Sequence, residues 1–273
     1  MKNKPTFTKL KFPRKHVLLP ILLIGLVFGG VGIYMLSTSS AASVNVSAAT
    51  YNILGQQHDE GSNLQSWSSR KTRVFSKIAD LDPGIIGMQE VISLDPYTGA
   101  SSPQRSDVVA FMSKKDYSSY TGSSQNSDPL FWKKDKFTLI SKKEVLIVAQ
   151  DSKAKGPAAR YLTYVRIKKG KQYISVFNYH YNQFRDQKVQ LDKLKKQYNA
   201  LKGKGDNVLF TGDFNGYDLA VRNVTGLWRV DDYDGIDHVM ATTDVYRKSW
   251  VNTGYGDPKA SDHPLIGVSV SLQ

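Results

Sequence analysis

Apolar and polar residues follow two repeats along this chain, and each repeat predicts one kind of secondary structure. Three segments, residues 66–81, 106–115 and 184–202, place apolar side chains three and four positions apart, which is the spacing of an amphipathic helix. Shorter apolar or alternating runs are typical of strands. The predicted strands are 44–54, 84–91, 128–132, 137–148, 159–167, 171–180, 206–214, 235–242 and 264–272.

Strands outnumber helices in this pattern, and several neighbouring strands are joined by short turns such as 168–171. Two packed sheets with helices on their outer faces would bury all of these apolar surfaces. We therefore expect a single domain of this kind over residues 44–273.

A different apolar segment precedes the domain. Residues 1–16 carry six basic residues and no acidic one, and the twenty residues 17–36 carry no charge. Twenty helical residues at ~1.5 Å each span about 30 Å, the thickness of a bilayer core. This pattern predicts a cytoplasmic segment, a single-pass anchor at 17–36 in the cell membrane, a linker at 37–43 and an extracytoplasmic domain. The alternative is a secretory signal cleaved near Ala42, which would release the domain.

Composition narrows the chemistry. The chain has no cysteine, which excludes disulfides and thiolate metal sites. Its formal net charge is +13, from 37 basic and 24 acidic residues; without the six leading cations the balance is 31 against 24, or +7. A basic domain suits a polyanionic partner such as nucleic acid, but basic surfaces also serve solubility. We expect the protein to be monomeric.

Polar side chains that bind metals or transfer protons gather at the ends of the predicted strands. They are Asn52, Gln89, Glu90, Asn178, His180, Asn182, Asp213, Asn215, Asp262 and His263. An unpaired carboxylate is costly to bury, and several carboxylates at one sheet edge would lower that cost by binding a cation. Carboxylate and amide oxygens favour Mg²⁺, Mn²⁺ or Ca²⁺ over structural zinc.

Six segments occur in an order that carries a resemblance. "TYNILG", "GMQEV", "FNYH", "TGDFNG", "IDHV" and "SDHPLI" are similar to motifs of the endonuclease/exonuclease/phosphatase family, which includes deoxyribonuclease I. The resemblance covers residues 44–273. It implies an α/β (α+β) fold of four layers, in which helices flank two stacked mixed β-sheets. It also implies an enzyme that hydrolyses phosphodiesters with a divalent metal ion.

The resemblance implies a metal site. Its principal ligand is Glu90, with Asn52 and Asp262 beside it, and the implied ion is Mg²⁺, with Mn²⁺ or Ca²⁺ as alternatives. Magnesium commonly uses one or two protein carboxylates and keeps several waters, so this small set is sufficient. The residues expected to contact the substrate phosphate are Arg160, Asn182 and Asn215.

The resemblance also implies a catalytic set. Its members are His180, Asp213, Asn215, Asp237 and His263. Asp237 would orient His263 toward the attacked phosphate, while Asp213 would position or deprotonate the attacking water. A metal ion and two imidazoles would neutralise the charge that builds on the phosphate oxygens. An adjacent carboxylate fixes the tautomer of a histidine and favours its cation.

Departures from the family pattern concern three positions. Leu54 stands where some relatives carry an acid, so a metal ligand is absent there. We expect His238 to be a core or supporting residue and His58 to lie in a mobile loop rather than in the cleft.

The motifs do not select one substrate, because one fold serves many chemistries. The basic domain and His180 favour DNA or RNA, and Tyr179, Tyr181 and Phe184 would lie beside bases or, alternatively, in the core. The alternatives are a phospholipase C-type sphingomyelinase or another phosphoesterase, and a non-catalytic surface binding protein.

Overall fold

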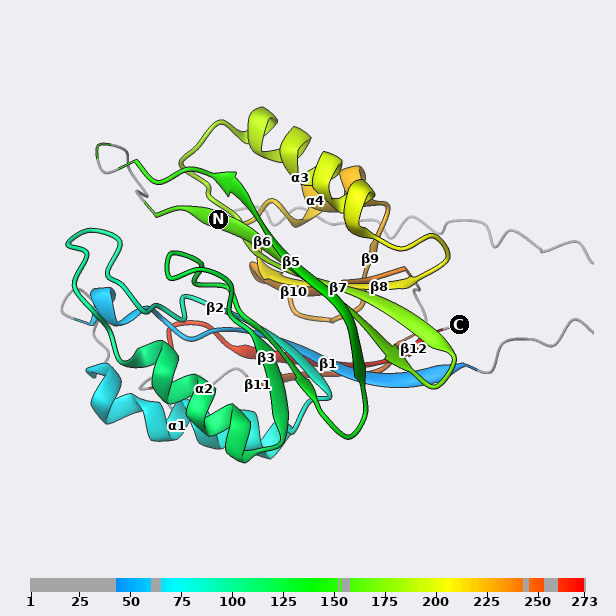
Figure 1. The fold of residues 1–273 in the computed structure, drawn as a ribbon, viewed down its shortest axis with the longest axis horizontal. Coiled ribbons are helices and arrows are strands. Elements are labelled where there is room, and N and C mark those ends of the chain that lie inside the picture. Colours follow the sequence, from blue (N-terminus) through cyan, green and yellow to red (C-terminus); the bar gives the residue numbers. More distant parts are fainter. Residues whose placement is uncertain are drawn as a thin grey trace, which may run out of the picture. The chain divides into compact units, whose positions relative to one another are not determined.

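Two six-stranded sheets face each other in this structure, a computed structural model that describes residues 43–59, 65–151, 153, 158–242, 246–252 and 260–272 (Figure 1). The first sheet has the order β11 (Tyr246–Asn252), β12 (Leu265–Leu272), β1 (Val44–Asn52), β2 (Ile85–Gln89), β4 (Leu130–Lys133) and β3 (Tyr117–Tyr120). The second has the order β5 (Thr138–Val148), β6 (Arg160–Lys169), β7 (Gln172–His180), β8 (Asn207–Asp213), β10 (Asp237–Ala241) and β9 (Trp228–Arg229).

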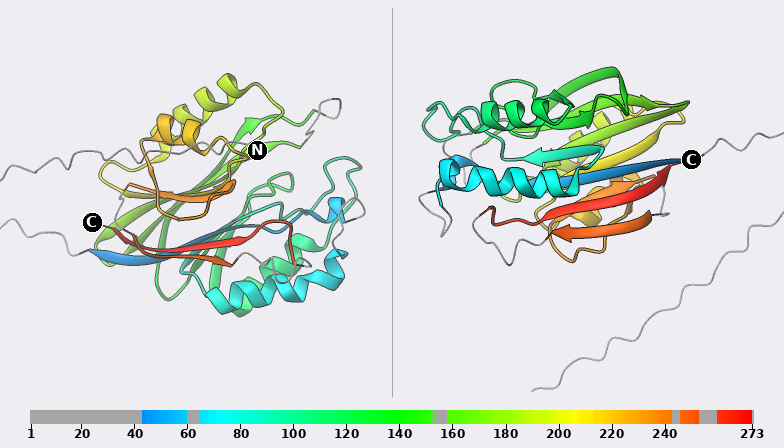
Figure 2. Two further views of the ribbon diagram at one scale, coloured as in Figure 1. Left: turned by 180° about the vertical axis from the view of Figure 1, so that it is seen from behind. Right: turned by 90° about the horizontal axis from the view of Figure 1, so that it is seen from below.

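Helices cover the outer face of each sheet. The helices α1 (Trp67–Leu81) and α2 (Gln104–Lys114) lie on the first sheet, and α3 (Gln187–Leu201) and α4 (Asp218–Thr225) lie on the second (Figure 2). Both sheets are mixed, because β1 pairs with β2 and β7 with β8 in parallel while the other pairs are antiparallel. The predicted four-layer α/β (α+β) sandwich is thus confirmed.

Three apolar clusters fill the spaces between the four layers. The central cluster packs one sheet on the other through small and branched side chains such as Val46, Ile85, Val176 and Val268. The second lies between the first sheet and its helices, and the third, rich in aromatic rings, lies between the second sheet and α3 and α4. Burial of this surface is the main force that holds the layers together.

A buried polar bridge interrupts the central apolar layer. Gln89 Nε2 donates to Asn178 Oδ1 over 2.7 Å, and the hydroxyl of Thr211 donates to the same oxygen over 3.0 Å. The backbone approach is close here, since a Cβ on Gly87 would lie 1.9 Å from Thr211 Oγ1 and 2.5 Å from Asn178 Oδ1. Only glycine fits at this point, and the bridge fixes one sheet against the other.

The element boundaries differ from the predicted ones in instructive places. Helix α3 begins at Gln187 instead of 184, because the side chain of Asp186 accepts the backbone N–H of Val189 as an N-terminal cap. Helix α4 and the strands β3, β9 and β11 are absent from the predicted elements. Three of them, α4, β3 and β9, are short, and the serines at the centre of β3 carry no apolar repeat.

The predicted membrane span at 17–36 lies outside the described residues, as does the region around Ala42. Within the described ranges, every helix is too short or too polar to cross a bilayer. The anchor therefore stays a prediction.

The ends of six strands meet at one edge of the sandwich. Asn52 pairs with Gln89 at the ends of β1 and β2, while Asp213 pairs with both His180 and Asp237 at the ends of β7, β8 and β10. The chain enters β12 just after His263 at the same edge. Main-chain pairing thus brings together side chains that lie far apart in the sequence.

Asp206 ties three strands together at the opposite edge. Its carboxylate accepts two hydrogen bonds from the guanidinium of Arg166, each of 2.8 Å, and a third of 2.7 Å from Ser175. The carboxylate side chain is only 2% exposed. Burial opposes its ionisation, but the hydrogen bonds and the charge of Arg166 outweigh burial and lower the pKa of Asp206.

The first prediction concerns this carboxylate. Because its folded pKa lies below the unfolded value of about 4, its stabilising effect is present above that pH and is lost as the pH falls through the folded pKa. Asp206→Asn should lower the free energy of unfolding by about 2 kcal/mol at pH 7 and by clearly less at pH 3. Urea unfolding at both pH values measures this difference.

The matched control is Asp192→Asn, which removes a carboxylate from the exposed pair with Lys188 on α3. Exposed pairs contribute roughly 0–1 kcal/mol, so this variant should unfold much like the parent. An equal loss at pH 3 and pH 7 for Asp206→Asn would contradict the proposed ion pair.

Candidate active site

One carboxylate oxygen lies at the centre of the strand-end cluster. Asp213 Oδ2 lies 3.0 Å from Asn52 Nδ2, 3.5 Å from His180 Nε2 and 3.8 Å from His263 Nε2. Asn52 and His263 belong to the first sheet, whereas His180 and Asp213 belong to the second. Two imidazoles and an amide from both halves of the sandwich therefore converge on a single acidic oxygen.

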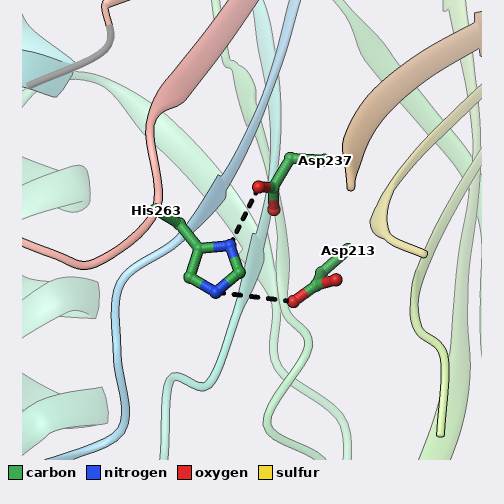
Figure 3. Close-up of side chains that lie close together, drawn as sticks. All are labelled: Asp213, Asp237 and His263. Carbon is green, nitrogen blue, oxygen red and sulfur yellow. Dashed lines mark hydrogen bonds and ion pairs between the residues drawn. The ribbon is translucent and has the colours of Figure 1, made fainter. Parts of the chain in front are cut away.

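His263 is held by a second carboxylate from behind. Its Nδ1 lies 2.8 Å from Asp237 Oδ2, while its Nε2 faces Asp213 (Figure 3). Burial disfavours the charged ring, but the hydrogen bond and the charges of Asp237 and Asp213 outweigh it and raise the pKa of His263 to about 10. The ring is therefore a cation at neutral pH, with its Nε2 proton directed into the site.

His180 has the opposite protonation preference. Burial and the positive charge of Arg160 lower its pKa well below the ordinary value, against the attraction of Glu90. The neutral ring carries its proton on the nitrogen that faces Asp213, because that nitrogen alone has an acceptor; Nδ1 is buried without a partner. One charged and one neutral imidazole thus face the same oxygen.

Glu90 lies beside this group and stays ionised. Its Oε1 accepts from Asn52 Nδ2 over 3.0 Å, and its Oε2 accepts from the backbone N–H of Gly55 over 2.8 Å. Burial opposes its charge, but the electrostatic attraction of the neighbouring His180 ring and these two hydrogen bonds lower the pKa of Glu90 to about 2. By contrast, burial and the neighbouring Asp237 raise the pKa of Asp213.

The oxygen donors around Glu90 fit a hard divalent cation. A carboxylate oxygen of Glu90 and one of Asp213 each lie 3.0 Å from the same nitrogen of Asn52, so acidic oxygens already converge on one electropositive group. Oxygen donors of this kind suit Mg²⁺, Mn²⁺ or Ca²⁺. Asn52 itself acts here as a hydrogen-bond donor, since its oxygen accepts the N–H of Leu54 over 3.0 Å.

Other acidic groups also lie near the site. Asp213, Asp237 and His263 offer ligand atoms within 4.8 Å of one another, so these three side chains could hold a metal ion when the ring of His263 gives up its proton. Asp262 is exposed, and its charge acts on His263, Asp237 and Arg70. Its role as a metal ligand beside Glu90 stays a prediction.

Backbone geometry at the site is unusual. Leu54, Glu90 and Asn215 have positive φ angles of 58°, 61° and 48°, a region that side chains other than glycine rarely adopt. Each lies one or two residues after a strand that ends at the site. Conformations of this kind cost roughly 1–3 kcal/mol and persist where the surrounding structure enforces them, which is common at functional sites.

The three predicted phosphate-binding residues make different contacts in the structure. Arg160 begins β6, and its charge acts on His180 and on Asp128; its buried Nε lacks a hydrogen-bond partner. Asn215 donates its side-chain amide to the carbonyl of Tyr181 over 2.9 Å. The side chain of Asn182 caps the following turn by accepting the N–H of Phe184.

Several polar and aromatic residues near the predicted site belong to the core instead. Tyr179 and Tyr181 are fully buried in the aromatic cluster under α3, so neither lies open to a base. His238 is also fully buried, between Asp231 and the carbonyl of Gly235. Gln89 and Asn178 form the inter-sheet bridge.

Two residues near the site, His58 and Asp128, are not among those predicted from the sequence. His58, assigned to a mobile loop, lies 3.9 Å from Glu90 and contacts the exposed ring of Tyr97 edge-on. Asp128 is buried between strands, and burial raises its pKa to about 6, against the charge of Arg160. No short motif marks these positions, because tertiary contacts alone bring them to the site.

A buried arginine holds the loops that carry the site. Arg70 of α1 donates to the carbonyls of Ile53, Leu54 and Ala260 and pairs with Asp59 over 3.1 Å. These carbonyls flank Asn52 on one side and the segment 261–263 on the other. The helix thereby fixes two loops whose backbone polar groups need a partner.

The fold and this cluster define a class of phosphoester hydrolases. The profile of the endonuclease/exonuclease/phosphatase family matches residues 49–263, which is well over half of the chain. The chain belongs to this family, as the ordered motifs predicted. A search among curated proteins found no match.

Solved structures of similar fold cover nearly the whole domain. A family protein from Bacteroides vulgatus has a TM-score of 0.67 and 18% identity over 84% of this chain and 100% of its own. ANGEL2, a 2',3'-cyclic phosphatase in complex with adenosine-2',3'-vanadate, has a TM-score of 0.63 and 15% identity over 84% and 96%. TDP2 from D. rerio, complexed with single-strand DNA product, has a TM-score of 0.59 and 15% identity over 82% and 98%.

The second prediction tests the buried arginine. Arg70→Met keeps the length of the side chain but leaves Asp59 and three carbonyls without their donor. Removing one partner of a buried pair costs about 3–5 kcal/mol, so the free energy of unfolding should fall by about that amount. Urea unfolding measures it, with Lys114→Met on the exposed face of α2 as the matched control. Equal stability of both variants would show that Arg70 does not fix these loops.

Proposed function

We propose that this protein is an extracytoplasmic, divalent-metal-dependent phosphodiesterase, and most specifically a nuclease that hydrolyses DNA or RNA. The observation that carries the proposal is the convergence of His180 and His263 on Asp213 beside Glu90. Monoester hydrolysis releases a leaving group as readily, but two imidazoles suit a substrate whose phosphate bears ester oxygens on two sides. The excess of basic residues in 44–273 favours a polyanionic substrate.

Water attack on the phosphorus follows from these protonation states. A water beside Asp213 loses its proton to Oδ2, whose raised pKa makes it a stronger base than an ordinary carboxylate. The water oxygen bonds to phosphorus while the ester bond on the opposite side breaks, and the departing ester oxygen takes up a proton from solvent water. The imidazolium of His263 and the neutral ring of His180 donate hydrogen bonds to the phosphate oxygens as their charge increases.

Asp237 acts through His263. Its hydrogen bond to Nδ1 directs Nε2 toward the substrate and stabilises the cationic ring. Glu90, with Asn52 and Asp262 as the other predicted ligands, would hold a divalent ion, which would supply charge stabilisation to the substrate phosphate when bound. Arg160, whose charge reaches His180, would contact a phosphate oxygen as a bidentate donor.

The third prediction concerns the imidazole of His263. His263→Ala should lower kcat by roughly 10²–10⁴-fold, because it removes both a hydrogen bond and a positive charge from the transition state. Asp237→Asn should lower kcat by less, because the ring remains but loses its orienting anion. Steady-state hydrolysis of bis(p-nitrophenyl) phosphate, with thermal unfolding in parallel, measures both effects.

In the double variant with His180→Ala and His263→Ala, kcat should fall by less than the product of the two single effects, because both residues act on one phosphate. The control is Asp192→Asn, far from the site on α3. Parental activity of a correctly folded His263→Ala would refute this assignment.

The fourth prediction distinguishes the substrates and the metal. The full chain should cleave plasmid DNA, single-stranded DNA or RNA with Mg²⁺ or Mn²⁺, and exhaustive chelation should abolish the activity. Binding to nucleic acid should weaken steeply with salt, because phosphate contacts release counterions. Hydrolysis of sphingomyelin vesicles without cleavage of any nucleic acid would replace the nuclease by the phospholipase C-type alternative. Full activity after chelation would reject the metal.

A further inference from the structure

One stretch of the domain sequence carries all of its net positive charge. Residues 134–204 contain 18 lysines and arginines and only 5 acidic residues. The remainder of 44–273 contains 13 basic and 19 acidic residues. The net charges are thus +13 for this stretch and −6 for everything else, so the net positive charge of the domain comes from β5, β6, α3 and the segments that join the elements of this stretch.

Five lysines of this stretch lie at the end of the second sheet that is opposite to the site. We call them the lysine end: Lys136, Lys168, Lys171, Lys202 and Lys204. The hairpin that joins β6 to β7 carries Lys168 and Lys171, and the turn before β8 carries Lys204. Strand β7 runs nine residues from this hairpin to His180, which is about 30 Å at ~3.3 Å per residue.

Strand β1, the first strand of the domain, begins at the same end. The side chain of Lys169 donates to the carbonyl of Asn45 over 2.7 Å, so the hairpin lies beside the start of β1 (Figure 1). The predicted span 17–36 is separated from β1 by the linker 37–43. Seven extended residues reach at most about 25 Å.

Two members of the lysine end contact aromatic rings rather than carboxylates. Lys168 lies 5.3 Å from the centre of the Tyr173 ring, and Lys202 lies 4.8 Å from that of Tyr198. Within the described residues, no carboxylate forms an ion pair with any member of the lysine end. A ring positions a cation without cancelling its charge, so the field of these lysines remains directed outward.

We propose that the lysine end rests on the anionic headgroups of the membrane to which the predicted span tethers the domain. The span places the start of β1 within a linker length of the bilayer, and the surface beside that start is the basic one. Lysines near an anionic leaflet are attracted over about one Debye length. The active site then lies about 30 Å from the membrane and opens away from it. A nucleic acid on the same lysines is the competing occupant.

The experiment uses the full chain in two kinds of vesicle, phosphatidylcholine alone and phosphatidylcholine with phosphatidylglycerol. A water-soluble acylating reagent labels exposed amines, and mass spectrometry gives the rate for each lysine. The lysine end should be labelled severalfold more slowly in the anionic vesicles, with recovery at 1 M salt. Lys188 and Lys193, exposed on the first half of α3, are internal references whose rates should not change.

The matched variants separate a specific surface from bulk charge. Lys168→Glu with Lys171→Glu and Lys204→Glu should remove the protection of Lys136 and Lys202. Lys188→Glu with Lys193→Glu and Lys195→Glu makes the same change in net charge and should leave the protection intact.

Several results would overturn the proposal. Equal labelling of the lysine end in both vesicles, or a chain that does not float with the vesicles, would reject it. Protection by a DNA duplex without lipid, together with no effect of vesicles, would assign the surface to nucleic acid instead. None of these readouts depends on hydrolysis, so failure here and failure of the proposed nuclease are distinguishable.

Discussion

The contact between the two sheets at Asp213 is the constraint on which the rest of the structure depends. Neither sheet contains a complete site, because Asn52 and His263 come from one and His180 and Asp213 from the other. The spacing of the sheets must therefore be correct to a fraction of an ångström at one edge. The Gln89–Asn178 bridge and the missing side chain of Gly87 set that spacing directly beneath the site.

Burial of so many ionisable groups is tolerable only because each one has a partner of suitable charge. Burial raises the pKa of both Asp213 and Asp237, and the charge of Asp237 raises that of Asp213 further, yet His263 between them supplies a positive charge. An isolated carboxylate in the same place would become protonated or would destabilise the fold. The same pairing that makes the cluster tolerable also directs one proton of His263 into the site, so stability and chemistry rest on the same hydrogen bond.

Sequence patterns predicted the site residues that lie at strand ends. They did not predict the residues that only tertiary contacts bring to the site. Apolar runs ending in Asn52, Glu90, His180 and Asp213 place those side chains on one rim, and the register of the sheets then brings them together. Periodicity cannot show that His58 reaches Glu90. Nor can it distinguish Tyr179 in the core from a tyrosine in the cleft, since both readings share one pattern.

The charges of the site also bear on how the binding of its ligands is coupled. Glu90 is an anion, and Asp213 adds partial negative charge, so an approaching phosphodiester meets repulsion at the position where it must react. His263 and Arg160 offset part of this repulsion, while His180 is neutral and offsets none. A divalent cation at Glu90 would reverse the local sign and lower this repulsion, so the proposed metal and the substrate phosphate would each favour the binding of the other.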